Sequence, residues 1–181
     1  MKYFTKEFPK ADNSSSLSKR QQEAIHRKFL RNSKAYQKQL SRLEGRVSQA
    51  AWNFFYFGFG RWGLHDAHLL SFTAGDELEL PADGSLRFRY NTQKARVRVL
   101  ILNRHQNLLY SFTCSDIRKA VFDYPTDDPL WISGRLDDVL TYELTAANKQ
   151  YLRMEFLFSS GATILVEFAR LQFRRQRVYR P

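Results

Sequence analysis

The sequence predicts an α+β protein in which a basic N-terminal amphipathic helix, or two helices, precedes a mainly antiparallel β-sandwich or curled sheet of about seven strands. Apolar side chains recur at helical spacing from Ile25 to Phe54, and from Leu64 onward their period changes to two. The 181 residues suffice for one ordinary domain with an appendage. We therefore divide the chain into a basic helical segment, 1–60, and an antiparallel β-domain, 61–181, with a basic C-terminal tail.

The helix is the first element that the sequence predicts. Ser18 and Gln21 have the spacing of a capping box, in which both side chains satisfy backbone groups of the first turn. One stripe of a 3.6-residue period follows, with Lys and Arg on the other face; its members are Ile25, Phe29, Tyr36, Leu40, Leu43, Val47 and Phe54. Gly45 costs about 1 kcal/mol relative to Ala in a helix, so we expect a kink or a break there.

An aromatic and glycine-rich segment, 52–63, follows the helix. Its three glycines are expected to end the helix, because glycine adopts backbone angles that a helix excludes. Its rings predict a plug that joins the helix to the β-domain. An exposed aromatic patch for a partner or a membrane surface is the alternative.

Short segments of alternating polarity predict the strands. They span 64–73, 77–80, 85–90, 95–102 and 108–114, and the last third adds a three-strand meander over 138–145, 151–158 and 163–175. Pro125 and Pro129 predict that 115–135 is a loop, with room for a short helix or strand at either end.

Charge and cysteine content limit the classes of function. The net charge of +11 is located at the ends, since residues 1–50 hold 12 Lys/Arg against 4 Asp/Glu and residues 170–181 hold five arginines and no acid. The single cysteine, Cys114, excludes an intrachain disulfide. No stretch approaches the roughly 20 apolar residues of a membrane span, and residues 1–10 have no apolar run, so we expect a cytoplasmic protein.

A histidine-rich cluster is the best candidate for chemistry. His65, Asp66 and His68 lie on a predicted strand, where alternation opposes direct pairing of His65 with Asp66. A metal site would need further ligands from elsewhere in the chain, so a structural role is favoured. The acidic pair Asp137 and Asp138 could bind cations or a basic partner, although its place after Gly134 is typical of a turn. We identify no catalytic residue, no cofactor site and no metal site.

The C-terminal arginines are candidates for binding anions. Arg174, Arg175 and Arg177 lie among Phe173 and Tyr179, a combination that could bind phosphates and stack on bases. The Lys and Arg residues of the helix could add to this surface, although the sequence contains no recognised nucleic-acid module.

Short blocks of sequence resemble a known family. They are the opening Met-Lys-Tyr-Phe-Thr-Lys-Glu at 1–7, Leu-His-Asp-Ala at 64–67, and the blocks 156–161 and 164–168. They resemble a family of uncharacterised bacterial proteins that open with this heptapeptide, a domain of unknown function. The resemblance implies no activity and no catalytic residues. Proteins of this shape are also similar to immunity proteins that neutralise toxins by surface binding, although this chain is more basic than acidic toxin inhibitors.

These observations favour a non-enzymatic binding protein that engages a protein partner. The alternative is a nucleic-acid-associated protein that uses the basic helix and the arginine-rich tail. A metal-dependent hydrolase centred on His65, Asp66 and His68 is the second alternative. Whether the chain forms a homo-oligomer stays open.

Overall fold

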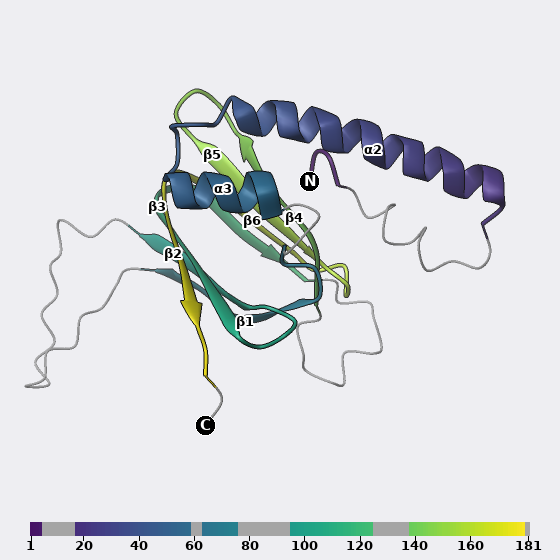
Figure 1. The fold of residues 1–181 in the computed structure, drawn as a ribbon. Helices are drawn as coiled ribbons and strands as arrows, with labels where there is room; N and C mark the ends of the chain where they lie inside the picture. Colours follow the sequence, from purple (N-terminus) through teal and green to yellow (C-terminus); the bar gives the residue numbers. More distant parts are fainter. Residues whose placement is uncertain (5–16, 59–62, 76–94, 125–137, 180–181) are drawn as a thin grey trace, which may run out of the picture.

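The computed structural model describes residues 1–4, 17–58, 63–75, 95–124 and 138–179. These residues form two helices followed by six antiparallel strands, which confirms the predicted α+β class (Figure 1). The strands close into a barrel in the order β1-β2-β3-β6-β5-β4, so the described strands number six instead of seven. The predicted strands at 77–80 and 85–90 lie outside the described residues.

The predicted helix is two helices. Helix α2 spans Lys19–Ser41 and begins with the predicted capping box, in which the Gln21 amide donates to the Ser18 hydroxyl. Helix α3 spans Gln49–Gly58. Gly45 lies between them with a φ of +80°, a left-handed conformation that favours glycine, so the chain breaks where the sequence predicted.

Four adjacent strands form one part of the barrel, and two of them, β3 and β6, make its longest pairing. They are β1 (Ala67–Gly75), β2 (Arg96–Leu102), β3 (Leu108–Asp123) and β6 (Thr163–Arg177). Strand β3 pairs with β6 over nearly its whole length, so the loop predicted over 115–135 begins with a strand, 115–123, that continues β3. A bulge between Ile117 and Lys119 shifts the register there.

The predicted C-terminal meander is present. It consists of β4 (Asp138–Ala146), β5 (Leu152–Phe158) and β6, each antiparallel to the next. Strand β4 closes the barrel by pairing with β1, but only through Ala67 with Val139 and His68 with Asp138. Within the described ranges, the rest of β4 therefore has no neighbouring strand on that side.

Helix α2 covers this edge of β4. The Leu144 amide donates to the Tyr36 hydroxyl at 2.9 Å. The Gln39 side chain, in the orientation that satisfies both of its ends, donates to the Leu144 carbonyl and accepts from the Ala146 amide, each at 3.2 Å. A helix thus supplies hydrogen bonds that a seventh strand would otherwise make.

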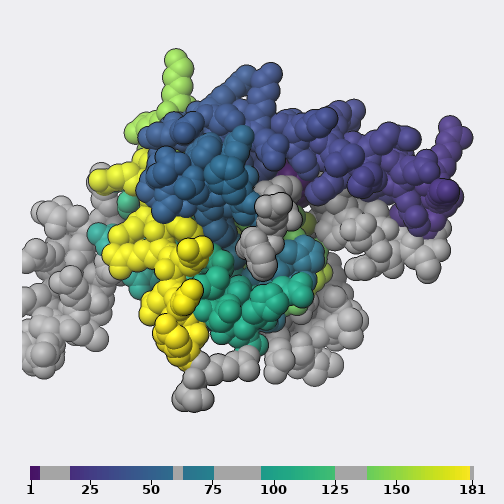
Figure 2. Space-filling model, in the orientation of Figure 1, coloured from purple at the N-terminus to yellow at the C-terminus, as the bar shows by residue number. Residues whose placement is uncertain are grey.

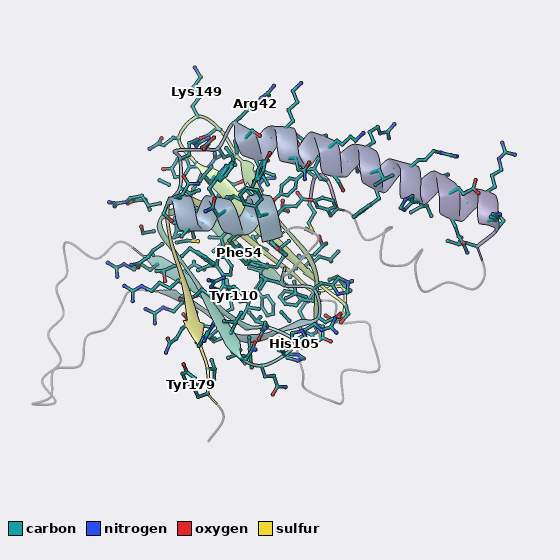
Figure 3. All side chains as sticks on the ribbon, in the orientation of Figure 1. Arg42, Phe54, His105, Tyr110, Lys149 and Tyr179 are labelled. Atoms are coloured by element: carbon teal, nitrogen blue, oxygen red, sulfur yellow. The ribbon has the colours of Figure 1, made fainter. Side chains whose placement is uncertain are left out.

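Helix α3 covers one end of the barrel with aromatic rings. Phe55 is fully buried, and the ring of Phe54 lies 4.8 Å from that of Phe173 and 5.2 Å from that of Tyr110. Figure 3 shows Phe54 between the helix and Tyr110. The predicted plug is confirmed for these two residues. On the far side of the helix Phe57 is 63% exposed.

Candidate functional site

The predicted histidine and aspartate candidates come together where β1 meets β4. His65 Nδ1 lies 2.8 Å from Asp66 Oδ1, and His68 Nδ1 lies 2.6 Å from Asp138 Oδ1. His68 and Asp138 are also register partners in the short β1–β4 ladder. Asp137 lies outside the described residues.

The direct contact of His65 with Asp66 corrects an expectation from the sequence. Alternation on a strand would place these neighbours on opposite faces. Strand β1 begins only at Ala67, and Asp66 has a φ of +59°, so the two residues form a turn instead of a strand. In this turn the Asp66 amide also donates to the Val139 carbonyl, which ties the turn to β4.

The chemistry available at this junction is limited. Both carboxylates contact a histidine Nδ1, and Arg104 Nη1 lies 3.5 Å from Asp66 Oδ2. Within the ranges that the structure describes, no three His, Cys, Asp or Glu side chains are grouped to hold a metal ion. The four side chains are 42–70% exposed, so water reaches them freely. Two orienting pairs on an open surface are typical of a structural junction.

The strand predicted over 163–175 is present as β6 and extends to Arg177, so three of the C-terminal arginines lie on it. Arg174, Arg175 and Arg177 are three of the last four residues of β6, where Ser111 pairs with Arg174 and Tyr110 with Arg175. Tyr179 follows and is 81% exposed. Figure 2 shows this part of β6 at the molecular surface, below α3. The strand fixes the direction of each arginine, because successive side chains alternate between the two faces.

The outer surface of β2, β3 and β6 carries arginines among small polar side chains. Register places Arg98 opposite Thr113 and Thr113 opposite Gln172; in the next outward row Ser111 is opposite Arg174, and further along Ser115 is opposite Arg170. We define the basic sheet face as these outward positions together with the preceding outward residue of β2: Arg96, Arg98, Ser111, Thr113, Ser115, Arg170, Gln172 and Arg174. Its four arginines are exposed, and the half-buried Leu100 also lies on this face.

Among the residues that the structure describes, Asp116 is an acid that contacts this face. Asp116 Oδ2 accepts from Arg170 at 2.7 Å, which offsets part of the charge of that arginine. Arg98 and Arg174 lie two strands apart, about 10 Å across the sheet at the usual strand spacing. These two exposed arginines therefore flank a strip of β3 hydroxyl groups.

The outer surface of β4 and β5, across the barrel from the basic sheet face, is covered. Its glutamates accept hydrogen bonds from other parts of the protein. Glu143 and Glu155 are register partners on β4 and β5, and both are buried. The Glu143 carboxylate accepts the backbone amides of Lys2, Tyr3 and Phe4 at 2.9, 2.7 and 2.6 Å. Successive amides that converge on one anion form a nest.

Two further contacts complete this covered surface. The Met1 ammonium donates to Glu155 Oε1 at 2.8 Å. Phe4 is buried against Tyr36 and Phe29 of α2, with ring centroids 5.3 and 5.7 Å apart. Residues 1–4 therefore fill the space between α2 and the outer surface of β4 and β5.

A third buried glutamate lies between two arginines. Glu167 on β6 accepts from Arg153 at 3.0 and 2.6 Å, and Arg118 Nε lies 3.6 Å from its other oxygen. The acids of β4, β5 and β6 are thus paired within the protein. The charge that remains on the outer strands is mainly positive.

Two protonated tyrosines and a thiol are buried in the protein, Tyr36 between α2 and β4 and the other two residues within the barrel. Burial raises the pKa of Tyr36 well above its ordinary value, and a backbone hydrogen bond from Leu144 opposes this only in part. Burial also raises the pKa of Cys114, which is fully buried as the sequence predicted, and that of Tyr142. Cys114 is therefore an inert core thiol and no nucleophile.

Sequence reasoning missed the two features that organise the surface. The arginines of β2 were visible in the alternation of Arg96, Val97, Arg98 and Val99, but nothing in the sequence placed β6 two strands away. Glu143 and Glu155 alternate with apolar residues like ordinary exposed side chains. Only the docking of residues 1–4 explains their burial.

The comparisons with known proteins add no relative. No family model, no curated protein and no solved structure matches this chain. Neither described helix is long and apolar enough to span a bilayer.

Proposed function

We propose that this chain is a non-enzymatic protein that binds double-stranded nucleic acid through the basic sheet face. The observation that carries the proposal is the flanking of the β3 hydroxyls by exposed Arg98 and Arg174. Arginine, serine, threonine and glutamine side chains are the groups that proteins use to contact phosphates. The glutamates on the described parts of β4, β5 and β6 are buried or paired, so they contribute little negative charge to this face.

The composition of the face favours a phosphate backbone over a protein partner. Protein interfaces concentrate binding energy in buried aromatic anchors. The outward positions that define the basic sheet face contain no aromatic ring. Proteins that bind single strands also need rings on which bases stack, so the same observation favours a duplex.

The proposal assigns no catalysis to the β1–β4 junction. His68 and Asp138 hold the short ladder that closes the barrel, and Asp66 ties the preceding turn to Val139. These contacts account for the pairs without a substrate. Contacts to the phosphate backbone of the duplex carry no sequence information, so we expect the affinity to depend little on base sequence.

The salt dependence of binding tests this function. Fluorescence anisotropy with a labelled mixed-sequence DNA duplex, repeated with duplex RNA, measures affinity across a range of salt concentrations. Four phosphate contacts predict a slope of log K against log salt of about −3.6. The double variant Arg98→Gln/Arg174→Gln should lower the magnitude of that slope by about 2 and weaken binding at low salt by roughly tenfold or more.

A matched variant separates this face from net charge. Lys119→Gln/Lys149→Gln also removes two cations, but Lys119 is opposite Glu167 and Lys149 is in the exposed β4–β5 turn. Equal weakening by both double variants would refute a specific face, and no binding at low salt would refute the function. If poly-glutamate binds as tightly as the duplex, the face recognises charge alone and an acidic protein becomes the better partner.

A further inference from the structure

Helix α2 carries a second basic surface that the proposed function does not use. The helix has seven Lys/Arg against one Glu. Five of these cations are spaced by seven, four, three and four residues, which places them on one face. We call this face the helix stripe: Arg20, Arg27, Arg31, Lys34 and Lys38, all of them exposed. At 1.5 Å per residue the stripe is about 27 Å long.

The helix stripe faces away from the barrel. Tyr36 and Leu40 are the buried residues of α2, and Tyr36 contacts β4 through the Leu144 amide. At 100° per residue, Arg27 and Lys38 lie about half a turn from Tyr36 around the helix. Figure 1 shows α2 along one side of the molecule, with its N-terminal part extending past the strands.

The two basic surfaces lie on opposite sides of the molecule. In the closed order β1-β2-β3-β6-β5-β4, strand β4 is three strands from β3 in either direction. Helix α2 covers the edge of β4, whereas the basic sheet face is centred on β3. One duplex that contacts the sheet face therefore leaves the helix stripe exposed.

The charge pattern of the stripe favours an anionic ligand over simple solvation. Arg27 with Arg31, Arg31 with Lys34, and Lys34 with Lys38 are neighbours at i,i+4 or i,i+3. Each like-charge pair destabilises the helix, and a solvated helix usually alternates acids with bases at these positions. A row of phosphates along the helix would remove this repulsion and release counterions.

We propose that the protein bridges two nucleic acid duplexes, one on the basic sheet face and one on the helix stripe. This inference rests on the proposed function, because both surfaces are assigned the same ligand. It adds that one molecule of protein holds two duplexes at the same time.

A capture experiment with the full chain tests bridging. One unlabelled DNA duplex is fixed on beads, the protein is added, and a second, fluorescent duplex of the same sequence is offered at low salt. We expect the wild-type protein to retain the second duplex. Arg27→Gln/Lys34→Gln should reduce that retention at least fivefold while the protein still binds one duplex in solution. The control Lys119→Gln/Lys149→Gln should retain an amount of fluorescent duplex within about twofold of that retained by the wild-type protein.

Further variants keep the test decisive if that helix variant is unstable. Arg20→Gln/Arg31→Gln removes two other cations of the stripe, and Arg27→Lys/Lys34→Arg exchanges cations without removing charge. The first should lose capture and the second should keep it. Circular dichroism of each variant confirms that α2 is folded.

The outcomes separate the inference from the proposed function. Undiminished capture by both charge-removing helix variants would overturn bridging through α2. A wild-type protein that binds one duplex and captures no second one would also overturn it, and would leave the proposed function intact. No binding of any duplex would refute the proposed function itself.

Discussion

Replacement of Glu143 by glutamine tests whether residues 1–4 hold the helical layer on the barrel. One oxygen of the Glu143 carboxylate accepts the Tyr3 and Phe4 amides, and the other accepts the Lys2 amide. A glutamine side chain keeps one oxygen and presents an NH₂ group to the remaining backbone N–H. At least one part-buried donor then loses its acceptor and faces another donor.

The structure sets the expected magnitude. A hydrogen bond to a charged group contributes about 1.5–3 kcal/mol, and a buried unsatisfied donor costs about 1–3 kcal/mol. We therefore expect Glu143→Gln to lower the free energy of unfolding by about 2–4 kcal/mol. Phe4 packs on Tyr36 and Phe29, so weaker docking of residues 1–4 should also loosen α2.

Urea unfolding and native-state hydrogen exchange measure the two effects. Glu44→Gln is the control, because Glu44 is exposed in the turn after α2 and its replacement should change stability by less than about 0.5 kcal/mol. In the Glu143 variant the amides of Tyr3 and Phe4 should lose protection before the amides of β5. A Glu143→Gln protein as stable as the Glu44 control, or with full protection at residues 3 and 4, would refute the reasoning.

Three further predictions concern the interior. Tyr36→Phe removes the acceptor of the buried Leu144 amide and should cost about 1–3 kcal/mol in urea unfolding; no loss would mean that water or another group replaces the hydroxyl. Gly63→Ala should lower the melting temperature, because a Cβ there would lie 2.6 Å from the Tyr142 hydroxyl, whereas an unchanged value would show that this contact relaxes freely. Cys114 should resist thiol reagents at pH 8 unless urea is added.

The raised pKa of that thiol also predicts the pH dependence of stability. The folded state keeps Cys114 protonated, while the unfolded state releases its proton near the ordinary value of 9.0. Stability from this group is complete below pH 9 and falls as pH rises above it, by up to about 1.4 kcal/mol per pH unit. The slope measured by urea unfolding between pH 9 and 10 should be smaller in Cys114→Ala; equal slopes in both proteins would contradict this assignment.

Sequence patterns correctly predicted those elements that depend on residues close together in the chain. The capping box at Ser18, the break at Gly45 and the alternation of β5 each depend on residues within a few positions of one another. The extension of β3 past Cys114 was missed because Asp116 and the bulge at Ile117 interrupt the alternation. Pairing with β6 maintains the strand there, and pairing between residues about 50 positions apart leaves no local pattern.

The closure of the barrel also depends on long-range contacts. The sequence favoured a sandwich or a curled sheet because several short strands suit either arrangement. Closure needs only two residue pairs between β1 and β4, and α2 replaces the rest of the missing strand through Tyr36 and Gln39. A helix that completes a strand edge has no counterpart in the alternation of β4 itself.

The location of charge shows why composition alone misplaced the candidate surface. Residues 51–169 hold 12 Lys/Arg against 14 Asp/Glu, which suggested a nearly neutral β-domain between basic ends. The fold buries Glu143, Glu155 and Glu167 against amides, an ammonium and arginines, so these acids contribute little field to the outer strands. Arg98, from the neutral segment, then lies on the same face as Arg174, from the basic end. The functional hypothesis therefore depends on which acids the fold neutralises, because a domain with no net positive charge can still present a basic surface.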